Sequence, residues 1–311
     1  MTDSRPQPPV GTERTRPSVA VGRAAARLAA AGLPSARAEA ELLTAYVLGV
    51  ARGRLALADG LDAGELTRLD GLVSRRVGHE PLQHLLGTAP FRHIELAVGP
   101  GVFVPRPETE LLAGWGIEAV RAGSGAAAPG GEASVTVVDL CGGSGAIALS
   151  VANEVPEAAV VAVERSGPAL DWLRRNAAAR AAAGDPPIRV VAGDVTDRGL
   201  LPELTGRVDL VLCNPPYVPV ATSVPAEVAR HDPAEAVFGG SDGLAVIRSV
   251  IVLAARLLRP GGRFGVEHDD THGAAVPDLL RADGRFAEVD EHPDLAGRRR
   301  FRAGRRHPSP P

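Results

Sequence analysis

Lysine is absent from the chain, so each of its 34 basic residues is an arginine. Aromatic residues make up only 3% of the sequence, which leaves few rings to stack on unpaired bases. The arginines are outnumbered by 37 acidic residues, and the formal net charge at pH 7 is −3. Proteins that bind nucleic acid usually carry a basic face. The composition therefore argues against direct binding to nucleic acid.

Cysteine is also scarce, because the chain has only Cys141 and Cys213, both in apolar, strand-like stretches. They form no metal-ligand pattern, and a disulfide framework is not expected in a chain of 311 residues. No run of 18 apolar residues is present, so we expect no membrane span. The polar, proline-rich residues 1–17 contain no hydrophobic signal core. These absences predict a cytoplasmic protein without a metal site.

The length and the 45% content of hydrophobic residues allow one large α/β domain and a smaller one. Apolar positions recur at helical spacing in much of residues 18–86, which predicts a small helical N-terminal domain, with Ser35 capping its second helix. Packing and substrate docking are both open as the role of this domain. The other predicted segments are a disordered leader at 1–17, a connector at 87–122, a flexible loop at 123–133, the main domain at 134–305 and a tail at 306–311. The connector is expected to contain a hairpin around residues 99–101, followed by a helix.

From residue 134 onward, short apolar runs alternate with helical stretches. This alternation predicts an α/β domain with a mostly parallel sheet covered by helices on both faces. The predicted strands are residues 135–140, 159–164, 188–193, 208–213, 263–267 and 286–290. A last run at 299–304 is predicted to add an antiparallel strand at the sheet edge. Ligands of such sheets bind beyond the carboxyl ends of the strands, so the residues that follow the strands are the candidates for a site.

The first candidate is a glycine-rich turn between a strand and a helix, at residues 139–145. Glycines let a ligand approach the backbone and offer N–H groups at a helix N-terminus. Glu164 ends the next strand, where a carboxylate can accept both ribose hydroxyls of an adenosine. Asp139 favours S-adenosylmethionine, because a carboxylate can bind the cationic end of that cofactor but would repel a pyrophosphate. The residues of this turn predicted to contact the cofactor are Asp139, Cys141, Gly142, Gly143, Ser144 and Gly145. The turn also fits the G-x-G-x-x-A dinucleotide pattern, so an NAD enzyme stays open here.

Two further strand ends carry candidate residues. Asp194 ends the third strand of the main domain and can accept the adenine amino group, while Val195 can line the adenine ring. Residues 214–217 (Asn-Pro-Pro-Tyr) follow an apolar strand, and their two prolines form a rigid turn without backbone donors. The oxygen of Asn214 and the carbonyl of Pro215 can accept both hydrogens of an amide or amino NH2, and Tyr217 can stack on the planar group behind it. This motif predicts transfer of a methyl group to a planar nitrogen.

With these motifs, residues 19–305 resemble the release-factor glutamine N5-methyltransferases, the HemK/PrmC family. The other segments that carry the resemblance are residues 80–87 (EPLQHLLG), 104–110 (VPRPETE), 238–244 (FGGSDGL) and 294–298 (DLAGR). The resemblance implies a Rossmann-like, seven-stranded class I methyltransferase domain behind a small helical domain. It also implies S-adenosylmethionine as cofactor and, as protein substrate, the glutamine of the Gly-Gly-Gln loop in peptide chain release factors.

The resemblance also assigns roles to individual residues. The residues implied in cofactor binding are residues 141–145 of the glycine-rich turn, Glu164, Val195 and Asn214. The residues implied in holding the glutamine are Asn214, Pro215, Pro216 and Tyr217, together with Arg106 and Glu108 of the segment at 105–110. Three alternatives stay open: a ribosomal-protein glutamine, a nucleic-acid amino group, and an inactive scaffold that only binds S-adenosylmethionine.

Overall fold

A computed structural model describes residues 14–123, 135–294 and 297–308. The chain divides into two compact units, residues 1–86 and residues 87–311. Most of the predicted leader, nearly all of the predicted loop at 123–133 and the last residues of the predicted tail lie outside the described residues. No helix of the described ranges is long and apolar enough to cross a membrane.

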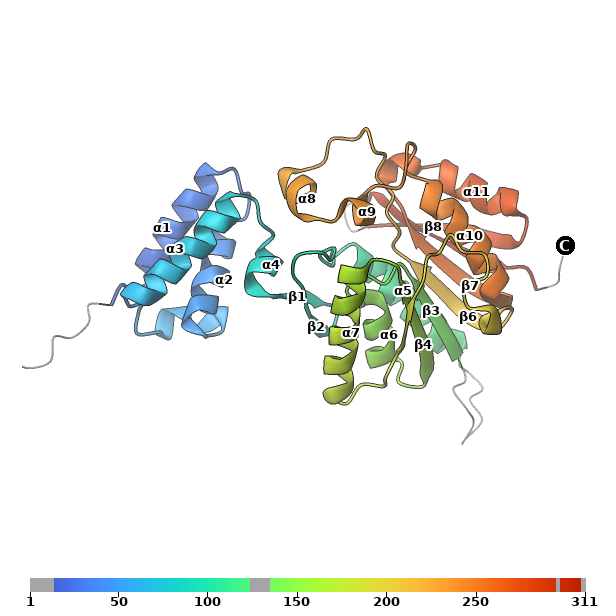
Figure 1. Ribbon diagram of the computed structural model, residues 1–311, viewed down its shortest axis with the longest axis horizontal. Coiled ribbons are helices and arrows are strands. Elements are labelled where there is room, and N and C mark those ends of the chain that lie inside the picture. The colour runs from blue at the N-terminus through green and yellow to red at the C-terminus, as the bar shows by residue number, and fades with distance from the viewer. Residues whose placement is uncertain (1–13, 124–134, 295–296, 309–311) are drawn as a thin grey trace, which may run out of the picture. The chain divides into compact units, whose positions relative to one another are not determined.

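The N-terminal unit is built from short helices around a small apolar core (Figure 1). These helices are α1 (Pro17–Ala30), α2 (Ala36–Leu48), the 3-10 helix η1 (Arg52–Leu57), α3 (Ala63–Val77) and α4 (Leu82–Leu86). Leu28, Leu43 and Val73 are fully buried between them. The unit therefore has the helical architecture that the apolar spacing predicts.

Two local predictions in this unit are wrong. Ser35 precedes α2, but its side chain makes no capping hydrogen bond. The leader was predicted to reach residue 17, whereas Thr15 pairs with Leu61 and α1 already begins at Pro17. The proline that suggested disorder instead occupies the first turn of a helix, where its missing N–H costs nothing.

A seven-stranded sheet forms the centre of the unit 87–311, with the strand order β5-β4-β3-β6-β7-β9-β8. Its strands are β3 (Val135–Leu140), β4 (Ala158–Glu164), β5 (Arg189–Ala192), β6 (Val208–Cys213), β7 (Leu258–Glu267), β8 (Phe286–Pro293) and β9 (Arg299–Arg306). The pairs from β5 to β7 are parallel, and β9 is antiparallel to both of its neighbours. The predicted seven-stranded Rossmann-like domain is confirmed.

The position of β9 differs from the prediction, which placed this strand at the edge of the sheet. The structure inserts β9 between β7 and β8, so β8 is the edge strand. The many arginines of β9 suggest an exposed strand, but Phe301 and Ala303 are buried. The strand also extends to Arg306, which belongs to the predicted tail.

Helices cover both faces of the sheet (Figure 1). On one face lie α5 (Thr109–Gly123), α6 (Ala146–Glu154) and α7 (Gly167–Ala182). On the other lie α10 (Ala245–Leu257) and α11 (Ala275–Asp283). Successive residues of β3 alternate between these layers, since Val137 packs with the first set and Val138 with the second. Both layers are apolar, which explains why the strands are continuous apolar runs.

The short elements between the sheet strands are η2 (Pro202–Leu204), α8 (Ala226–His231), α9 (Ala234–Val237) and η3 (Asp270–His272). Helices α8 and α9 follow β6 along the chain and carry residues toward the carboxyl end of the sheet. They contribute to the candidate site rather than to the core.

The hairpin of this unit is formed by other residues than predicted. It consists of β1 (Thr88–Phe91) and β2 (Ile94–Ala97), with Arg92 at a φ of 50° in its turn. The glycines at 99 and 101 instead pack against α7, where Gly99 contacts Trp172. Helix α5 packs on the sheet through Leu112 and Ile117. The predicted connector is therefore part of the sheet domain.

Candidate active site

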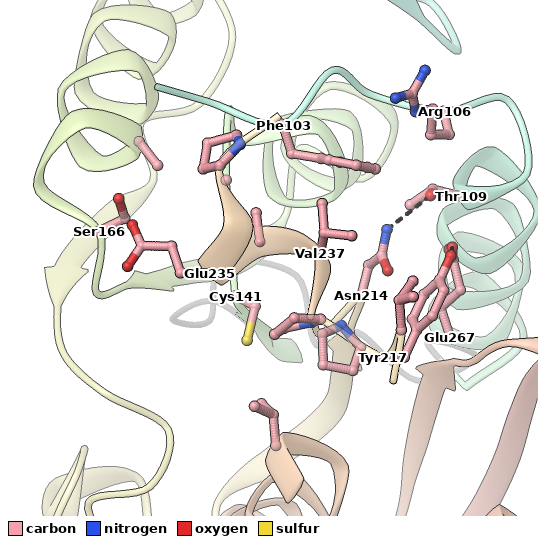
Figure 2. A pocket seen from close by; sticks show the side chains of 18 of the residues that line it. Phe103, Arg106, Thr109, Cys141, Ser166, Asn214, Tyr217, Glu235, Val237 and Glu267 are labelled. Carbon is pink, nitrogen blue, oxygen red and sulfur yellow. Dashed lines mark hydrogen bonds between the residues drawn. The ribbon is translucent and has the colours of Figure 1, made fainter. Parts of the chain in front are cut away.

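A cavity of about 690 Å³ opens at the carboxyl ends of β3, β4, β5 and β6 (Figure 2). All of its lining residues belong to the unit 87–311. Every predicted site residue except Asp139 and Gly145 lines this cavity. Those that line it are Arg106, Glu108, Cys141, Gly142, Gly143, Ser144, Glu164, Asp194, Val195, Asn214, Pro215, Pro216 and Tyr217. Segments predicted separately thus meet around one space.

Glu164 connects the glycine-rich turn to the end of β4. One of its carboxylate oxygens accepts the backbone N–H of Gly143 at 2.8 Å, and the other accepts the N–H groups of Arg165 and Ser166, also at 2.8 Å. The side chain is largely buried, yet it lines the cavity. These three donors fix the shape of the turn.

Asn176 of α7 also holds the glycine-rich turn in place. Its side-chain nitrogen donates to the carbonyl oxygens of Ser144 and Ala97, both at 2.9 Å, and its oxygen accepts the N–H of Ala97 at 2.8 Å. Asn176 is almost fully buried. The hairpin and the glycine-rich turn are therefore held together by one side chain.

Asp139 does not line the cavity and is almost fully buried beneath it. One of its oxygens accepts the N–H of Ala148 in the first turn of α6 at 3.1 Å, and the other has no partner among the described residues. Burial raises the pKa of Asp139 to about 8, far above its ordinary 3.8, while the bond from Ala148 acts in the opposite direction. This geometry fits a residue that holds the start of α6 better than a direct cofactor ligand.

Gly145 is the other predicted residue away from the cavity. A side chain at this position would collide with Leu173 and Leu149 of the helix layer. Gly145 therefore allows the turn to pack closely on the core.

Asp194 and Val195 line the cavity beyond the end of β5. The carboxylate of Asp194 accepts from the backbone and the hydroxyl of Thr196 and lies 3.3 Å from the guanidinium of Arg165. The backbone bond from Thr196 and then these other partners lower the pKa of Asp194. Asp194 is therefore ionised at neutral pH and can accept hydrogen bonds.

The Asn-Pro-Pro-Tyr turn is enclosed by residues 238–244. The N–H of Gly239 donates to the carbonyl of Val218, and a side chain at Gly239 would lie 2.4 Å from the carbonyl oxygen of Pro216. A side chain at Gly243 would lie 2.2 Å from the carbonyl oxygen of Tyr217. Only glycine fits at these two positions, which explains the spacing of glycines in this motif.

Asn214 lines the cavity and belongs to a network of polar side chains (Figure 2). Its amide nitrogen donates to the hydroxyl oxygen of Thr109 at 3.0 Å. The hydroxyl of Tyr217 donates to Glu267 at 3.1 Å, and Thr109 is also hydrogen bonded to Glu267. The second oxygen of Glu267 is buried and has no partner among the described residues.

Burial raises the pKa of Glu267 to about 7 from its ordinary 4.5, although the bonds from Thr109 and Tyr217 and the charge of Arg300 lower it. Burial also raises the pKa of Tyr217 well above its ordinary value. The phenol thus stays protonated and donates to Glu267, while the carboxyl changes its charge near neutral pH.

Arg106 lines the rim of the cavity, but its guanidinium is already engaged. It lies 2.9 Å from the buried carboxylate of Asp232, 3.6 Å from Glu227, and over the ring of Phe103. Arg106 thereby joins the segment before α5 to helix α8. Glu108 is more exposed and lies 3.9 Å from Arg300.

The lining residues that were not predicted individually include Phe103, Thr109, Glu267 and Arg300. Phe103 and Thr109 lie within or beside the Pro-Arg-Pro-Glu-Thr-Glu segment, so that motif held a signal for them. Glu267 ends β7, and the rule that sites lie beyond strand ends could have found it. Arg300 had no such signal, because its position depends on the insertion of β9.

Comparison with known proteins gives matches along nearly the whole chain. Residues 20–87 match the PrmC N-terminal domain family, and residues 129–230 match the Methyltransferase small domain family. A release factor glutamine methyltransferase of Mycolicibacterium smegmatis is 48% identical over 287 residues, which cover 92% of this chain and 96% of that protein.

A second relative has a different printed activity. A 4-amino-L-phenylalanine/4-methylamino-L-phenylalanine methyltransferase of Streptomyces pristinaespiralis is 41% identical over 279 residues, which cover 88% of this chain and 90% of that protein. Among solved structures, the hMettl16 catalytic domain in complex with an RNA hairpin has a TM-score of 0.50 at 14% identity, covering 69% of this chain and 76% of that one. The last likeness concerns the fold alone.

Proposed function

Because the chain belongs to the release factor glutamine methyltransferase family, we propose that it methylates the side-chain amide nitrogen of the glutamine in the Gly-Gly-Gln loop of peptide chain release factors. The chain is an S-adenosylmethionine-dependent methyltransferase. A release-factor substrate would place this activity in the cytoplasm.

The residues of the cavity fit S-adenosylmethionine. A volume of about 690 Å³ is in the range of small-molecule sites. Glu164 accepts three backbone N–H groups, and a carboxylate has about four acceptor positions, so it can still accept from a ribose. We assign the ribose to Glu164, the amino-acid end to the turn at 141–144, and the adenine to Asp194 and Val195. When bound, the cofactor supplies an electrophilic methyl group on a sulfonium.

The residues of the chain then have to align the glutamine amide nitrogen, which is a poor nucleophile, with the methyl group of the cofactor. The lone pair of an amide nitrogen is delocalised, so the nitrogen reacts only when it is well aligned. The oxygen of Asn214 and the carbonyl of Pro215 would accept the two N–H groups of the glutamine. These acceptors would stabilise the positive charge that develops on the nitrogen as it gains the methyl group. One of its two hydrogens would then leave as a proton to solvent, and the other stays on the methylated nitrogen. Tyr217 would lie along the plane of the amide.

One observation carries this proposal: the amide nitrogen of Asn214 is engaged by Thr109. The side-chain oxygen of Asn214 is therefore the atom that can accept from a substrate at the cavity. A hydrogen-bond acceptor at this place selects a nucleophile that carries hydrogens, such as NH2.

The test is mass spectrometry of a release factor after incubation with the protein and S-adenosylmethionine. We expect one added methyl group on the glutamine of the Gly-Gly-Gln loop and none on a release factor with Gln→Ala there. Asn214→Ala should lower turnover by about 10²–10³-fold, the usual effect of losing one such charge-stabilising partner. Methyl transfer to RNA, DNA or a ribosomal protein in place of the release factor would contradict the proposal.

The relative from Streptomyces pristinaespiralis supports a second candidate, a free aromatic amine. Its aniline nitrogen, like an amide nitrogen, is planar and has a delocalised lone pair, so the same acceptors suit both. Incubation with 4-amino-L-phenylalanine separates the candidates. We expect turnover on this amine to be far below turnover on the release factor, and the reverse order would favour the second candidate.

A further inference from the structure

The side-chain amide of asparagine can face a ligand with either end, so something must choose its orientation. In this structure the neighbour of Asn214 is the hydroxyl of Thr109, which can donate one hydrogen and accept others. Thr109 is buried at the start of α5 and is also hydrogen bonded to Glu267 at the end of β7. Three elements thus meet at one chain of polar groups (Figure 2).

The direction of these bonds follows from the charge of the carboxyl. An ionised Glu267 can only accept, so the single hydrogen of the Thr109 hydroxyl is directed to it. The oxygen of Thr109 can then only accept from Asn214, which requires the nitrogen end of the amide. Tyr217 donates to the same carboxylate and supports this direction. The oxygen of Asn214 is left for the cavity.

We propose that Thr109 and Glu267 are positioning residues that fix the Asn214 amide with its oxygen toward the cavity and so restrict the site to nucleophiles that carry N–H groups. This inference rests on the proposed function, because it concerns the same methyl-accepting site. It explains why a threonine in the segment before α5 and a glutamate from β7 lie behind the Asn-Pro-Pro-Tyr turn without belonging to it.

Protonation of Glu267 removes the constraint, because the carboxyl can then donate to Thr109 and the threonine hydrogen becomes free to turn. The pKa of Glu267, raised to about 7 by burial, puts this change near neutral pH. Other titratable or charged groups lie near Glu267 on the elements packed around it: Cys213 at the end of β6, Tyr217 on the turn, Arg300 on β9 and Glu108 before α5. Burial raises the pKa values of Cys213 and Tyr217 well above their ordinary values, so neither changes charge in this range.

The asparagine content of the chain allows a direct test. Only three asparagines occur, Asn153, Asn176 and Asn214, so protein labelled with ¹⁵N-asparagine gives three side-chain NH2 signal pairs. We expect the Asn214 pair to shift with a midpoint near pH 7, the pKa of Glu267, and Glu267→Gln to abolish this shift. Asn153 is an internal control, because its partner Asp185 has a lowered pKa and stays ionised in this range.

Variants of the threonine give a second readout. Thr109→Val keeps the shape but removes the hydroxyl, so we expect a displaced Asn214 signal and a kcat lower by about 10²-fold, with unchanged affinity for S-adenosylmethionine. Thr109→Ser keeps a hydroxyl, so its Asn214 signal and its kcat should both lie close to those of the unchanged protein. Thr44→Val is the matched control, because Thr44 is also buried but donates to the carbonyl of Ala40 in α2, in the other unit.

An unchanged Asn214 signal in Thr109→Val, or a shift near pH 7 that persists in Glu267→Gln, would overturn the inference. The signals are measured on the protein without substrate. If they behave as expected while the release factor stays unmethylated, the positioning role stands and the proposed substrate fails.

Discussion

The protonation of one residue, Asp139, makes the free energy of unfolding depend on pH. Its pKa is about 8 in the folded chain against an ordinary 3.8, so between these values the folded chain holds a proton that the unfolded chain releases. The free energy of unfolding therefore falls as the pH rises through this window, by up to about 1.4 kcal/mol per pH unit, and levels off above pH 8. Asn at this position has no proton to release and can still accept from Ala148.

We expect Asp139→Asn to weaken the fall in stability between pH 5 and pH 8, measured by urea unfolding at a series of pH values. Some fall remains in the variant, because Glu267 also has a raised pKa. Asp185→Asn is the control: the pKa of Asp185 is lowered, chiefly by its bond from Arg180, so its contribution changes only at acidic pH. Parallel curves for Asp139→Asn and the unchanged protein would refute the assigned protonation.

The residues that sequence reasoning identified belong to motifs contiguous in the chain. The glycine-rich turn and the Asn-Pro-Pro-Tyr turn each combine a strand end with unusual backbone residues, which is a local signal. The bond between Asn214 and Thr109 joins positions 105 residues apart, and no local pattern predicts such a contact. The burial that turns Asp139 away from the cavity also depends on the packed layers, so its role could not be read from its place near the glycines.

At the scale of elements, residues 238–244 act as a brace for the Asn-Pro-Pro-Tyr turn. We expect Gly243→Ala to be strongly destabilising, because Gly243 has a φ of 73° and an added side chain would lie 2.2 Å from the carbonyl oxygen of Tyr217. Gly284→Ala is a matched control, since its φ is 74° but nothing lies within 4 Å of the added carbon. That control carries the backbone cost alone, about 1–2 kcal/mol.

Urea unfolding of both variants measures the difference, and methyl transfer by Gly243→Ala under folding conditions shows whether the turn is displaced. Equal losses of stability in the two variants would contradict this prediction, because residues 238–244 would then accommodate the added carbon without a further loss of stability.

The element boundaries show where sequence patterns suffice. Strands β3 and β6 are apolar runs buried on both sides, and their bounds match the prediction. The hairpin was misplaced because its turn uses Arg92 at positive φ, whereas the glycines that suggested a turn serve contact with α7. A rare conformation of an arginine leaves no mark in the sequence.

At the scale of the whole molecule, the described cavity belongs to the unit 87–311 alone. A ligand that binds only the folded form makes local unfolding of the elements around its site less frequent. We therefore expect S-adenosylmethionine to slow hydrogen exchange in peptides around residues 141–147, 163–166 and 193–196, and to leave the helices α1 to α3 unchanged. Mass spectrometry of exchange with and without the cofactor measures this, and protection within residues 17–77 would contradict it.

The insertion of β9 has a consequence for the order in which the protein is made. Strand β9 is the last strand among the described residues, yet it lies between β7 and β8. A chain emerging from the ribosome therefore presents β7 with an open edge and β8 without its neighbour until residues 299–306 have left the tunnel. Open strand edges pair readily with other chains. The sheet can close only after synthesis has passed its final strand, so nascent chains of this protein should depend on protection from aggregation until then.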